Sequence, residues 1–387
     1  MQPSVVASSV FRYIGATLLV LLLAPSVSAS TVTDLAGRKV ELPDTIERIV
    51  LGESRYIPAL AILEGEHVVD RLVGMLPDFE MTDPAGYAQY LARFPALDDI
   101  PRVGHTSADS FSLEHVLAMD PDLAIFSLDG HGPGARHQDL VDRLERAGVV
   151  VIFIDFRQRP LENTQTSMAV LGEVLGREAQ AQAFNRFYQS ELDKVGQTVN
   201  RIPESHRLKV FLHSRLGRMD GCCETMARGM MSDFISFAGG HNMATELLPG
   251  VSGMLSLETL LTEPPDRYLA TAIGAPGLEL SADDLPYVVL GAGVDENTAQ
   301  RTFQRAVSRP GLEQLDPINV PGHALAIWHH FYNTPLNVVA VQAIAKWLYP
   351  LEFSALSPQS TLAELYQRFQ PVPLSGCYWV TLGDEAP

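Results

Sequence analysis

Uninterrupted apolar runs alternate with amphipathic segments along the first part of the chain. Residues 48–52, 122–128 and 149–155 are short apolar runs that predict buried strands, and residues 135–147 have the 3.6-residue spacing of a helix. Residues 31–47 contain two short alternating segments around a glycine, which predicts a hairpin. Apolar strands separated by helices are typical of a parallel sheet covered on both faces, so we predict an α/β fold.

The pattern changes to a long helical spacing between residues 161 and 202. Apolar residues recur here every three or four positions, and no proline occurs before Pro203. The stretch predicts one helix about 50–60 Å long, bent near Gly172 or Gly176. Strand-and-helix alternation then resumes, and its predicted elements are strands at 209–213, 268–273 and 286–290 and helices at 231–238 and 338–348.

The N-terminus has the pattern of a secretory signal. Arg12 is followed by an apolar stretch at 14–24, then by Pro25 and by the small residues of Val27-Ser28-Ala29. About eleven residues rise only about 16 Å as a helix, which is too short to cross a bilayer. We therefore predict that residues 1–29 are a cleaved signal peptide and that the mature protein is exported.

An eleven-residue segment occurs twice, on either side of the predicted long helix. Residues 112–122 read Ser-Leu-Glu-His-Val-Leu-Ala-Met-Asp-Pro-Asp, and residues 256–266 read Ser-Leu-Glu-Thr-Leu-Leu-Thr-Glu-Pro-Pro-Asp. Each copy predicts a short helix with a serine N-cap, ended by proline ahead of a strand. The repeat indicates two related lobes, each with one glutamate, Glu114 or Glu258, in the first turn of this helix. A favourable interaction with the helix dipole is the alternative explanation of either glutamate.

Composition and charge exclude several classes of protein. The chain has 46 acidic and 28 basic residues, so its formal net charge is −18, and such a surface repels nucleic acid. A hydrophobic content of 46% fits packed cores rather than disorder. Three cysteines are too few for a disulfide scaffold or a cysteine-rich zinc module.

Three motifs resemble the periplasmic solute-binding proteins of metal-chelate ABC importers, the family that binds ferric siderophores, haem and vitamin B12. They are the opening segment 32–50, the Ser-Leu-Glu…Pro-Asp-Leu segment that starts at Ser112, and Ala-Gly-Gly-His-Asn at 238–242. The resemblance implies two α/β lobes bridged by one long helix, with the ligand cleft between the lobes. The lobes would comprise residues 30–160 and 203–387, with 161–202 as the link and a C-terminal extension on the second lobe.

The resemblance also implies a function. The protein is expected to capture an iron chelate of the siderophore type and to deliver it to an inner-membrane ABC permease. Haem, cobalamin and nickel chelates are the alternative ligands. The family's proteins are not enzymes, so we expect no resident cofactor or metal, and we expect a monomer. One glutamate on each lobe of these proteins contacts permease arginines, and Glu114 and Glu258 fall on those positions.

Most candidate ligand contacts follow predicted strands, where a cleft between two lobes would open, whereas His329 and Tyr332 lie in an aromatic segment near Trp328. A cationic cluster in an acidic protein suits an anionic chelate, because carboxylates accept bidentate hydrogen bonds from guanidinium groups. Solvated surface charges are the alternative for the arginines, and ordinary packing is the alternative for the histidines, which lack metal-ligand spacing. The predicted ligand-binding residues are Arg55, Tyr56, His131, Arg136, Arg215, Arg218, Arg228, His329 and Tyr332.

Residues 130–135 support a different interpretation. Gly-His-Gly-Pro-Gly-Ala follows a strand and matches the G-x-G-x-x-A dinucleotide fingerprint, and Asp155 ends the next strand as a candidate ribose ligand. An exported NAD-dependent oxidoreductase is therefore the alternative outside the binding-protein class. The export signal argues against it, and Pro133 removes a backbone amide that would have bound phosphate.

The three cysteines predict a disulfide. Cys222 and Cys223 are adjacent, and Cys377 lies near the C-terminus. In an oxidising compartment we expect one of the pair to bridge to Cys377 and the other to stay free, in preference to a strained vicinal disulfide.

Overall fold

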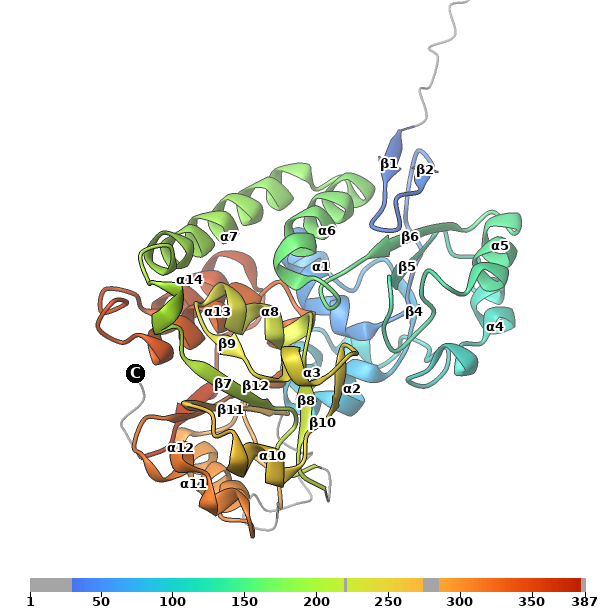
Figure 1. The fold of residues 1–387 in the computed structure, drawn as a ribbon. Helices are drawn as coiled ribbons and strands as arrows, with labels where there is room; N and C mark the ends of the chain where they lie inside the picture. Colours follow the sequence, from blue (N-terminus) through green and yellow to red (C-terminus); the bar gives the residue numbers. More distant parts are fainter. Residues whose placement is uncertain (1–29, 219–220, 274–284, 384–387) are drawn as a thin grey trace, which may run out of the picture.

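The computed structural model describes residues 30–218, 221–273 and 285–383, which form two α/β lobes (Figure 1). The predicted signal peptide, residues 1–29, lies outside the described residues. In the described ranges, no helix combines the length and the apolar character needed to cross a membrane. The N-terminal hairpin is confirmed: β1 (Thr31–Thr33) pairs antiparallel with β2 (Lys39–Glu41).

The N-terminal lobe is built on a parallel sheet with the strand order β4-β3-β5-β6. The strands are β3 (Ile49–Leu51), β4 (Leu72–Met75), β5 (Leu123–Ser127) and β6 (Val150–Ile154). The helices are α1 (Ile57–Glu64), α2 (Asp78–Thr82), α3 (Pro84–Arg93), α4 (Leu113–Ala118) and α5 (Gln138–Arg146). Alternate residues of β5 enter different core clusters, Phe126 with Leu144 of α5 and Ile125 with Leu60 of α1. Helices therefore cover both faces of this sheet, as the apolar strand pattern predicted.

The C-terminal lobe contains a five-stranded sheet with the order β13-β12-β11-β7-β9, in which only β13 is antiparallel to its neighbour. Its strands are β7 (Lys209–His213), β9 (His241–Asn242), β11 (Arg267–Ala272), β12 (Ala324–Trp328) and β13 (Trp379–Thr381). A separate ribbon pairs β8 (Glu224–Met226) with β10 (Ser252–Met254). The helices of this lobe are α8 (Met230–Phe237), α9 (Ala244–Leu247), α10 (Leu257–Thr262), α11 (Glu296–Val307) and α12 (Asp316–Asn319).

The strand predicted at 286–290 is wrong. Val288 donates its amide hydrogen to Leu216, whereas the amide of Leu290 donates to Ile273. The segment thus divides its hydrogen bonds between two neighbours, and only the bridge between Ile273 and Val289 has sheet geometry.

The predicted single long helix is also wrong, because the structure divides it in two. Helix α6 (Pro160–Leu175) ends at Gly176, whose φ of 66° is left-handed, and α7 (Glu178–Val199) follows. Gly172 lets the start of α7 approach closely, since a Cβ there would overlap Ala181. Gln165 bonds to Gln189, so the two helices pack as an antiparallel hairpin between the lobes.

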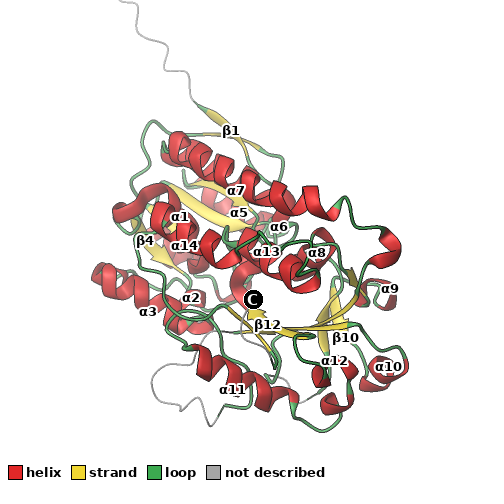
Figure 2. Ribbon diagram, turned by 90° about the vertical axis from the view of Figure 1, so that its left-hand side faces the viewer, coloured by secondary structure: helices red, strands yellow, loops and turns green. Residues whose placement is uncertain are grey.

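A C-terminal extension continues from α13 (Asn337–Leu348) into α14 (Pro358–Phe369) and then β13. Figures 1 and 2 show α14 beside α13, and Figure 2 shows it near α1 of the N-terminal lobe. Gln370 accepts a hydrogen bond from the Tyr90 hydroxyl at 2.6 Å and donates to the Pro58 carbonyl at 3.0 Å. The extension therefore connects the two lobes a second time.

The disulfide prediction is wrong. The structure joins Cys222 to Cys223 and leaves Cys377 as a free thiol. Cys377 precedes β13, whereas the adjacent pair precedes β8, which lies beside β7. Three strand spacings, about 14 Å, separate β7 from β13, and a disulfide needs α-carbons within about 7 Å.

Candidate ligand-binding cleft

A cavity of about 230 Å³ lies between the lobes, lined by residues that follow the carboxyl ends of strands in both sheets. In α/β folds this edge of the sheet is where ligands bind, because the connecting loops open there. From the N-terminal lobe it is lined by Arg55, Met81, Thr82, His131 and Arg157. From the C-terminal lobe it is lined by Ser214, Arg215, Arg218, Glu224, Thr225, Met226, Met230, Ser252, Ile273, His329, His330 and Tyr332.

The N-terminal wall is a buried ionic network around Arg55. The guanidinium group donates to Glu53 at 2.7 Å and to Asp78 at 2.9 Å, and all three side chains are at most 4% exposed. Burial raises the pKa of Glu53. The positive charge of Arg55 and the hydrogen bond from the His131 amide lower it by more, so the pKa of Glu53 lies below its ordinary value. Burial and the charge of Glu53 raise the pKa of Asp78 to about 6, against the effect of Arg55.

The glycine-rich loop at 130–135 is shaped by the same glutamate. The His131 amide donates to Glu53 at 3.0 Å, and a Cβ at Gly130 would overlap the Glu53 carboxylate. The His131 ring lines the cavity, and burial together with the charge of Arg55 lowers its pKa to about 4. The glycines thus allow a close approach to a carboxylate of the protein itself.

The carboxylate of Asp155, like that of Glu53, is already bound by groups of the protein itself. Its carboxylate accepts hydrogen bonds from the amides of Arg157, Gln158 and Arg159 and from the Asn163 side chain, all within 3.1 Å. These bonds fix the start of α6, so the carboxylate is not available to a ribose hydroxyl. The geometry argues against the dinucleotide interpretation of this loop.

The C-terminal wall presents Arg215 and Arg218 from the loop after β7. Arg215 is 43% exposed and makes a bidentate contact with Glu224, at 2.5 and 3.2 Å. Its backbone has a φ of 49°, and its amide is held by the Thr271 hydroxyl at 2.8 Å. The Arg218 guanidinium lies 4.7 Å from the centre of the Tyr287 ring. Both cations stand at the edge of the cavity rather than inside the core.

The turn after β12, His329–Asn333, contributes two imidazoles and a phenol. His329 bonds to the Thr271 hydroxyl at 2.9 Å, and His330 Nε2 donates to the Thr82 carbonyl of the other lobe at 3.0 Å. Burial and nearby positive charge lower the pKa of both rings, that of His330 to about 3. Both rings are therefore neutral at physiological pH.

No cluster of three or more His, Cys, Asp or Glu able to hold a metal ion occurs in the described part of the chain.

Six of the nine predicted ligand residues come together in this cavity. They are Arg55, His131, Arg215, Arg218, His329 and Tyr332. Tyr56 is fully buried behind the wall. Arg136 is exposed and lies 3.6 Å from Asp129, and Arg228 donates to the carbonyls of residues 245, 248 and 250.

Sequence reasoning missed Arg157, which lines the cavity directly after β6. Its Nη1 donates to the Asp129 carbonyl at 3.2 Å, while its buried Nε has no hydrogen-bond partner in the structure. The rule that selected Arg55, a cation just beyond a buried strand, would also have found it.

The repeated segments form α4 and α10, one in each lobe, as predicted. Glu114 and Glu258 are exposed in the first turn of their helices. The Ser256 hydroxyl caps α10 by accepting from the Thr259 amide at 3.1 Å, whereas the Ser112 side chain makes no capping bond.

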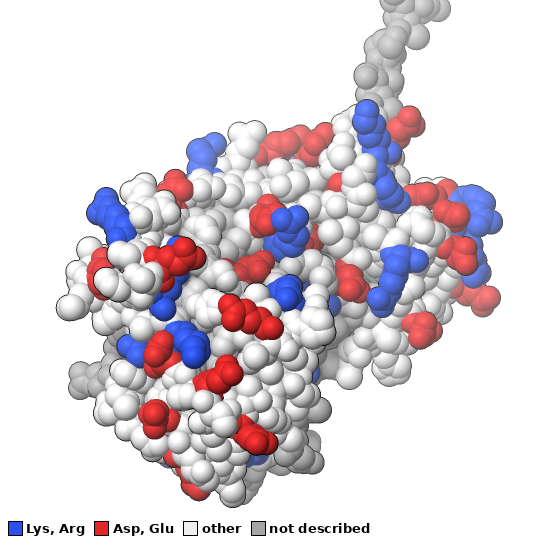
Figure 3. All heavy atoms as spheres, in the orientation of Figure 1, with Lys and Arg blue, Asp and Glu red and all other residues white. Residues whose placement is uncertain are grey.

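Acidic and basic side chains are interspersed over the face shown in Figure 3, so that face has no continuous basic surface for nucleic acid.

A family model described as "Periplasmic binding protein" matches residues 72–275, more than half of the chain. The chain belongs to the periplasmic binding protein family. No curated protein sequence matches it. The resemblance inferred from the three motifs is confirmed, and the protein is a solute-binding protein of the kind used by ABC transporters.

Solved structures share the fold of this binding protein. The TroA-like periplasmic binding protein FepB from Veillonella parvula is 22% identical, covers 91% of this chain and 99% of its own, and has a TM-score of 0.79. A periplasmic haem-binding protein from Pseudomonas aeruginosa is 20% identical over 79% of this chain and 94% of its own, with a TM-score of 0.52. An ABC-type Fe3+-hydroxamate transport protein from Saccharomonospora viridis is 19% identical over 83% and 99%, with a TM-score of 0.54. At these identities the likeness establishes the two-lobed fold.

Proposed function

We propose that this binding protein captures an anionic iron chelate of the siderophore type and delivers it to an inner-membrane ABC permease. The observation that carries the proposal is a set of guanidinium groups brought to one cavity by both lobes. They belong to Arg55, Arg157, Arg215 and Arg218. Guanidinium groups bind the carboxylate and other oxyanion groups of such chelates with charge-assisted hydrogen bonds.

The positive charge of the cavity also ranks the alternative ligands according to their own charge. Cobalamin and nickel complexes of neutral ligands carry no net negative charge for the guanidinium groups to recognise. Haem is the second candidate, because it carries two carboxylates and its iron takes neutral imidazole as an axial ligand. His329 and His330 line the cavity, and burial lowers the pKa of both rings, which favours the neutral form.

Fluorescence titration of the mature protein with chelates of different charge tests the ligand class. We expect an anionic ferric chelate to bind more tightly than an uncharged ferric trihydroxamate, and to weaken as salt is raised. Equal affinities that do not respond to salt would contradict recognition of charge. Haem is tested in parallel by its absorption spectrum, which changes when a protein imidazole ligates the iron.

We also propose that Glu114 and Glu258 are the permease contacts, in line with their exposure on matched helices of the two lobes. The double variant Glu114→Lys with Glu258→Lys reverses both charges and should nearly abolish uptake in cells that depend on this protein. Chelate affinity should be unchanged, since neither residue lines the cavity. Normal uptake by the double variant would show that these glutamates do not dock the protein.

Export is tested by N-terminal sequencing of protein released by osmotic shock. The proposal places the first residue of the mature chain near Ser30, directly before β1. Retention of residues 1–29 in the membrane fraction would contradict a cleaved signal peptide.

A further inference from the structure

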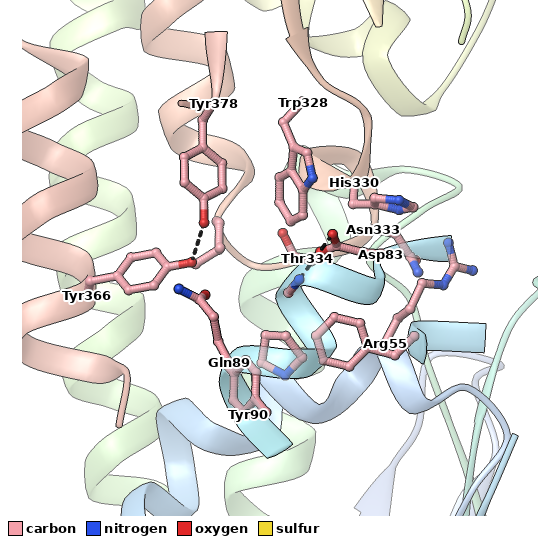
Figure 4. Close-up of a pocket in the computed structure, with 14 residues that line it drawn as sticks. Arg55, Asp83, Gln89, Tyr90, Trp328, His330, Asn333, Thr334, Tyr366 and Tyr378 are labelled. Atoms are coloured by element: carbon pink, nitrogen blue, oxygen red, sulfur yellow. Dashed lines mark hydrogen bonds between the residues drawn. The ribbon is translucent and has the colours of Figure 1, made fainter. Parts of the chain in front are cut away.

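A second, smaller cavity lies beside the ligand cleft, and Arg55 and His330 line both (Figure 4). Its volume is about 30 Å³, room for about two water-sized groups. The N-terminal lobe contributes α3 to its wall, and the C-terminal lobe contributes the turn after β12. The C-terminal extension completes the wall with Tyr366 and Tyr378.

Five aromatic side chains contribute to the wall of this cavity. It contains the rings of Phe79, Tyr90, Trp328, Tyr366 and Tyr378. The tyrosine hydroxyls already have hydrogen-bond partners, Tyr90 with Gln370 at 2.6 Å and Tyr366 with Tyr378 at 3.0 Å, so none of the three is left unpaired. Aromatic faces attract cations through their quadrupole, and the attraction is stronger where water is excluded.

One carboxylate, Asp83, belongs to this cavity. The side chain is 3% exposed and accepts one long hydrogen bond, from the Gly86 amide at 3.3 Å. Gly86 leaves room for the carboxylate, since a Cβ there would overlap its Oδ2. Burial raises the pKa of Asp83 to about 7, opposed only by the Gly86 amide. Among the described residues, no Lys, Arg or His forms an ion pair with it, so the buried charge has no counterion.

A second acceptor lies in the shared wall. His330 Nε2 must carry the hydrogen that it donates to the Thr82 carbonyl, so Nδ1 of the neutral ring bears a lone pair. This Nδ1 is buried and has no hydrogen-bond partner. Arg55 also lines this cavity, but its guanidinium group pairs with Glu53 and Asp78. It therefore leaves Asp83 and His330 Nδ1 free to bind a cation.

We propose that this cavity binds a primary ammonium group, with Asp83 as the counterion and His330 Nδ1 as a second acceptor. An ammonium group carries three N–H donors and one positive charge, which matches an unpaired carboxylate, a free imidazole nitrogen and an aromatic wall. The group belongs either to a small free amine or to a pendant amine of the chelate in the neighbouring cleft.

Calorimetric titration with methylammonium chloride at pH 8 tests the site, with methanol as the uncharged probe of equal size and ionic strength held constant. We expect methylammonium to bind at least tenfold more tightly than methanol. Asp83 is the N-cap of α3. Asp83→Asn keeps the side-chain oxygen that accepts from the Gly86 amide but removes the charge, and it should weaken methylammonium binding at least tenfold. Asp295→Asn is the matched control, because Asp295 caps α11 in the same way but is exposed, and it should change nothing.

Equal binding of methylammonium and methanol by the unaltered protein would overturn the proposal, whatever the folding of the variants. Full retention of methylammonium binding by Asp83→Asn would also overturn it. A ferric chelate with a pendant amine, compared with its N-acetylated form, distinguishes the two sources. A preference for the amine that Asp83→Asn removes assigns the group to the chelate, and no preference assigns it to a free amine. The methylammonium result does not depend on chelate binding, so failure of the proposed function would be seen separately.

Discussion

Arg55 on the N-terminal wall of the cleft and Arg215 on the C-terminal wall carry the same guanidinium group in different surroundings. Arg55 is 4% exposed and pairs with two buried carboxylates, whereas Arg215 is 43% exposed and pairs with one. A buried charge that loses its partner destabilises the fold strongly, whereas exposed pairs contribute little to stability. The N-terminal wall is therefore a fixed part of the lobe, and the C-terminal wall holds charge that a ligand can engage.

The largest expected effect is that of breaking the buried network. Glu53→Ala removes a carboxylate that accepts from Arg55, Ser127, His131 and Asn333, and it leaves Arg55 short of a partner. We expect the free energy of unfolding to fall by about 3–5 kcal/mol in urea titrations. The matched change on the other wall, Glu224→Ala, should cost about 0–1 kcal/mol. Similar losses in both variants would erase the distinction between the walls.

Asp83 shows what burial does to a carboxylate that lacks the guanidinium partner of Asp78. Its pKa is raised to about 7 from an ordinary 3.8, so the folded state holds the proton more tightly than the unfolded state. Stability should then fall as pH rises from about 4 to about 7. Asp83→Asn escapes this loss and should be more stable than the unaltered protein by about 2–4 kcal/mol at pH 8, with no difference near pH 4. Thermal unfolding across this range measures it, and a constant difference would contradict the assignment.

Smaller effects, on affinity rather than stability, are expected on the C-terminal wall. Losing a charge-assisted hydrogen bond to the ligand costs about 1.5–3 kcal/mol, so Arg215→Ala or Arg218→Ala should weaken an anionic ferric chelate about ten- to over a hundred-fold. The unfolding free energy should change by about 1 kcal/mol or less. Unchanged affinity in both variants would show that the exposed guanidinium groups are solvated surface charges.

Local patterns predicted the parts of the fold that local physics decides. The apolar runs at 122–128 and 149–155 became β5 and β6, because a strand buried on both faces has few other arrangements. The division between α6 and α7 depends on one residue, Gly176, adopting a left-handed conformation, which helical spacing does not report. Burial also explains why some of the predicted ligand residues do not line the cavity. Whether an arginine after a strand enters the core, as Arg55 does, or faces solvent, as Arg136 does, is decided by distant partners such as Asp78.

The smallest expected effect belongs to Arg136, which the sequence placed with the ligand contacts and the structure does not. Its side chain is 71% exposed, its contact with Asp129 is 3.6 Å, and it does not line the cavity. An exposed ion pair of this kind contributes about 0–1 kcal/mol, and salt screens its field over about 8–10 Å. Arg136→Ala should therefore change chelate affinity less than about twofold and leave unfolding unaltered, which makes it the control for Arg215→Ala. A tenfold loss of affinity would mean that the loop after β5 moves into the cleft when ligand binds, and the contrast between a fixed and an engaging wall would no longer hold.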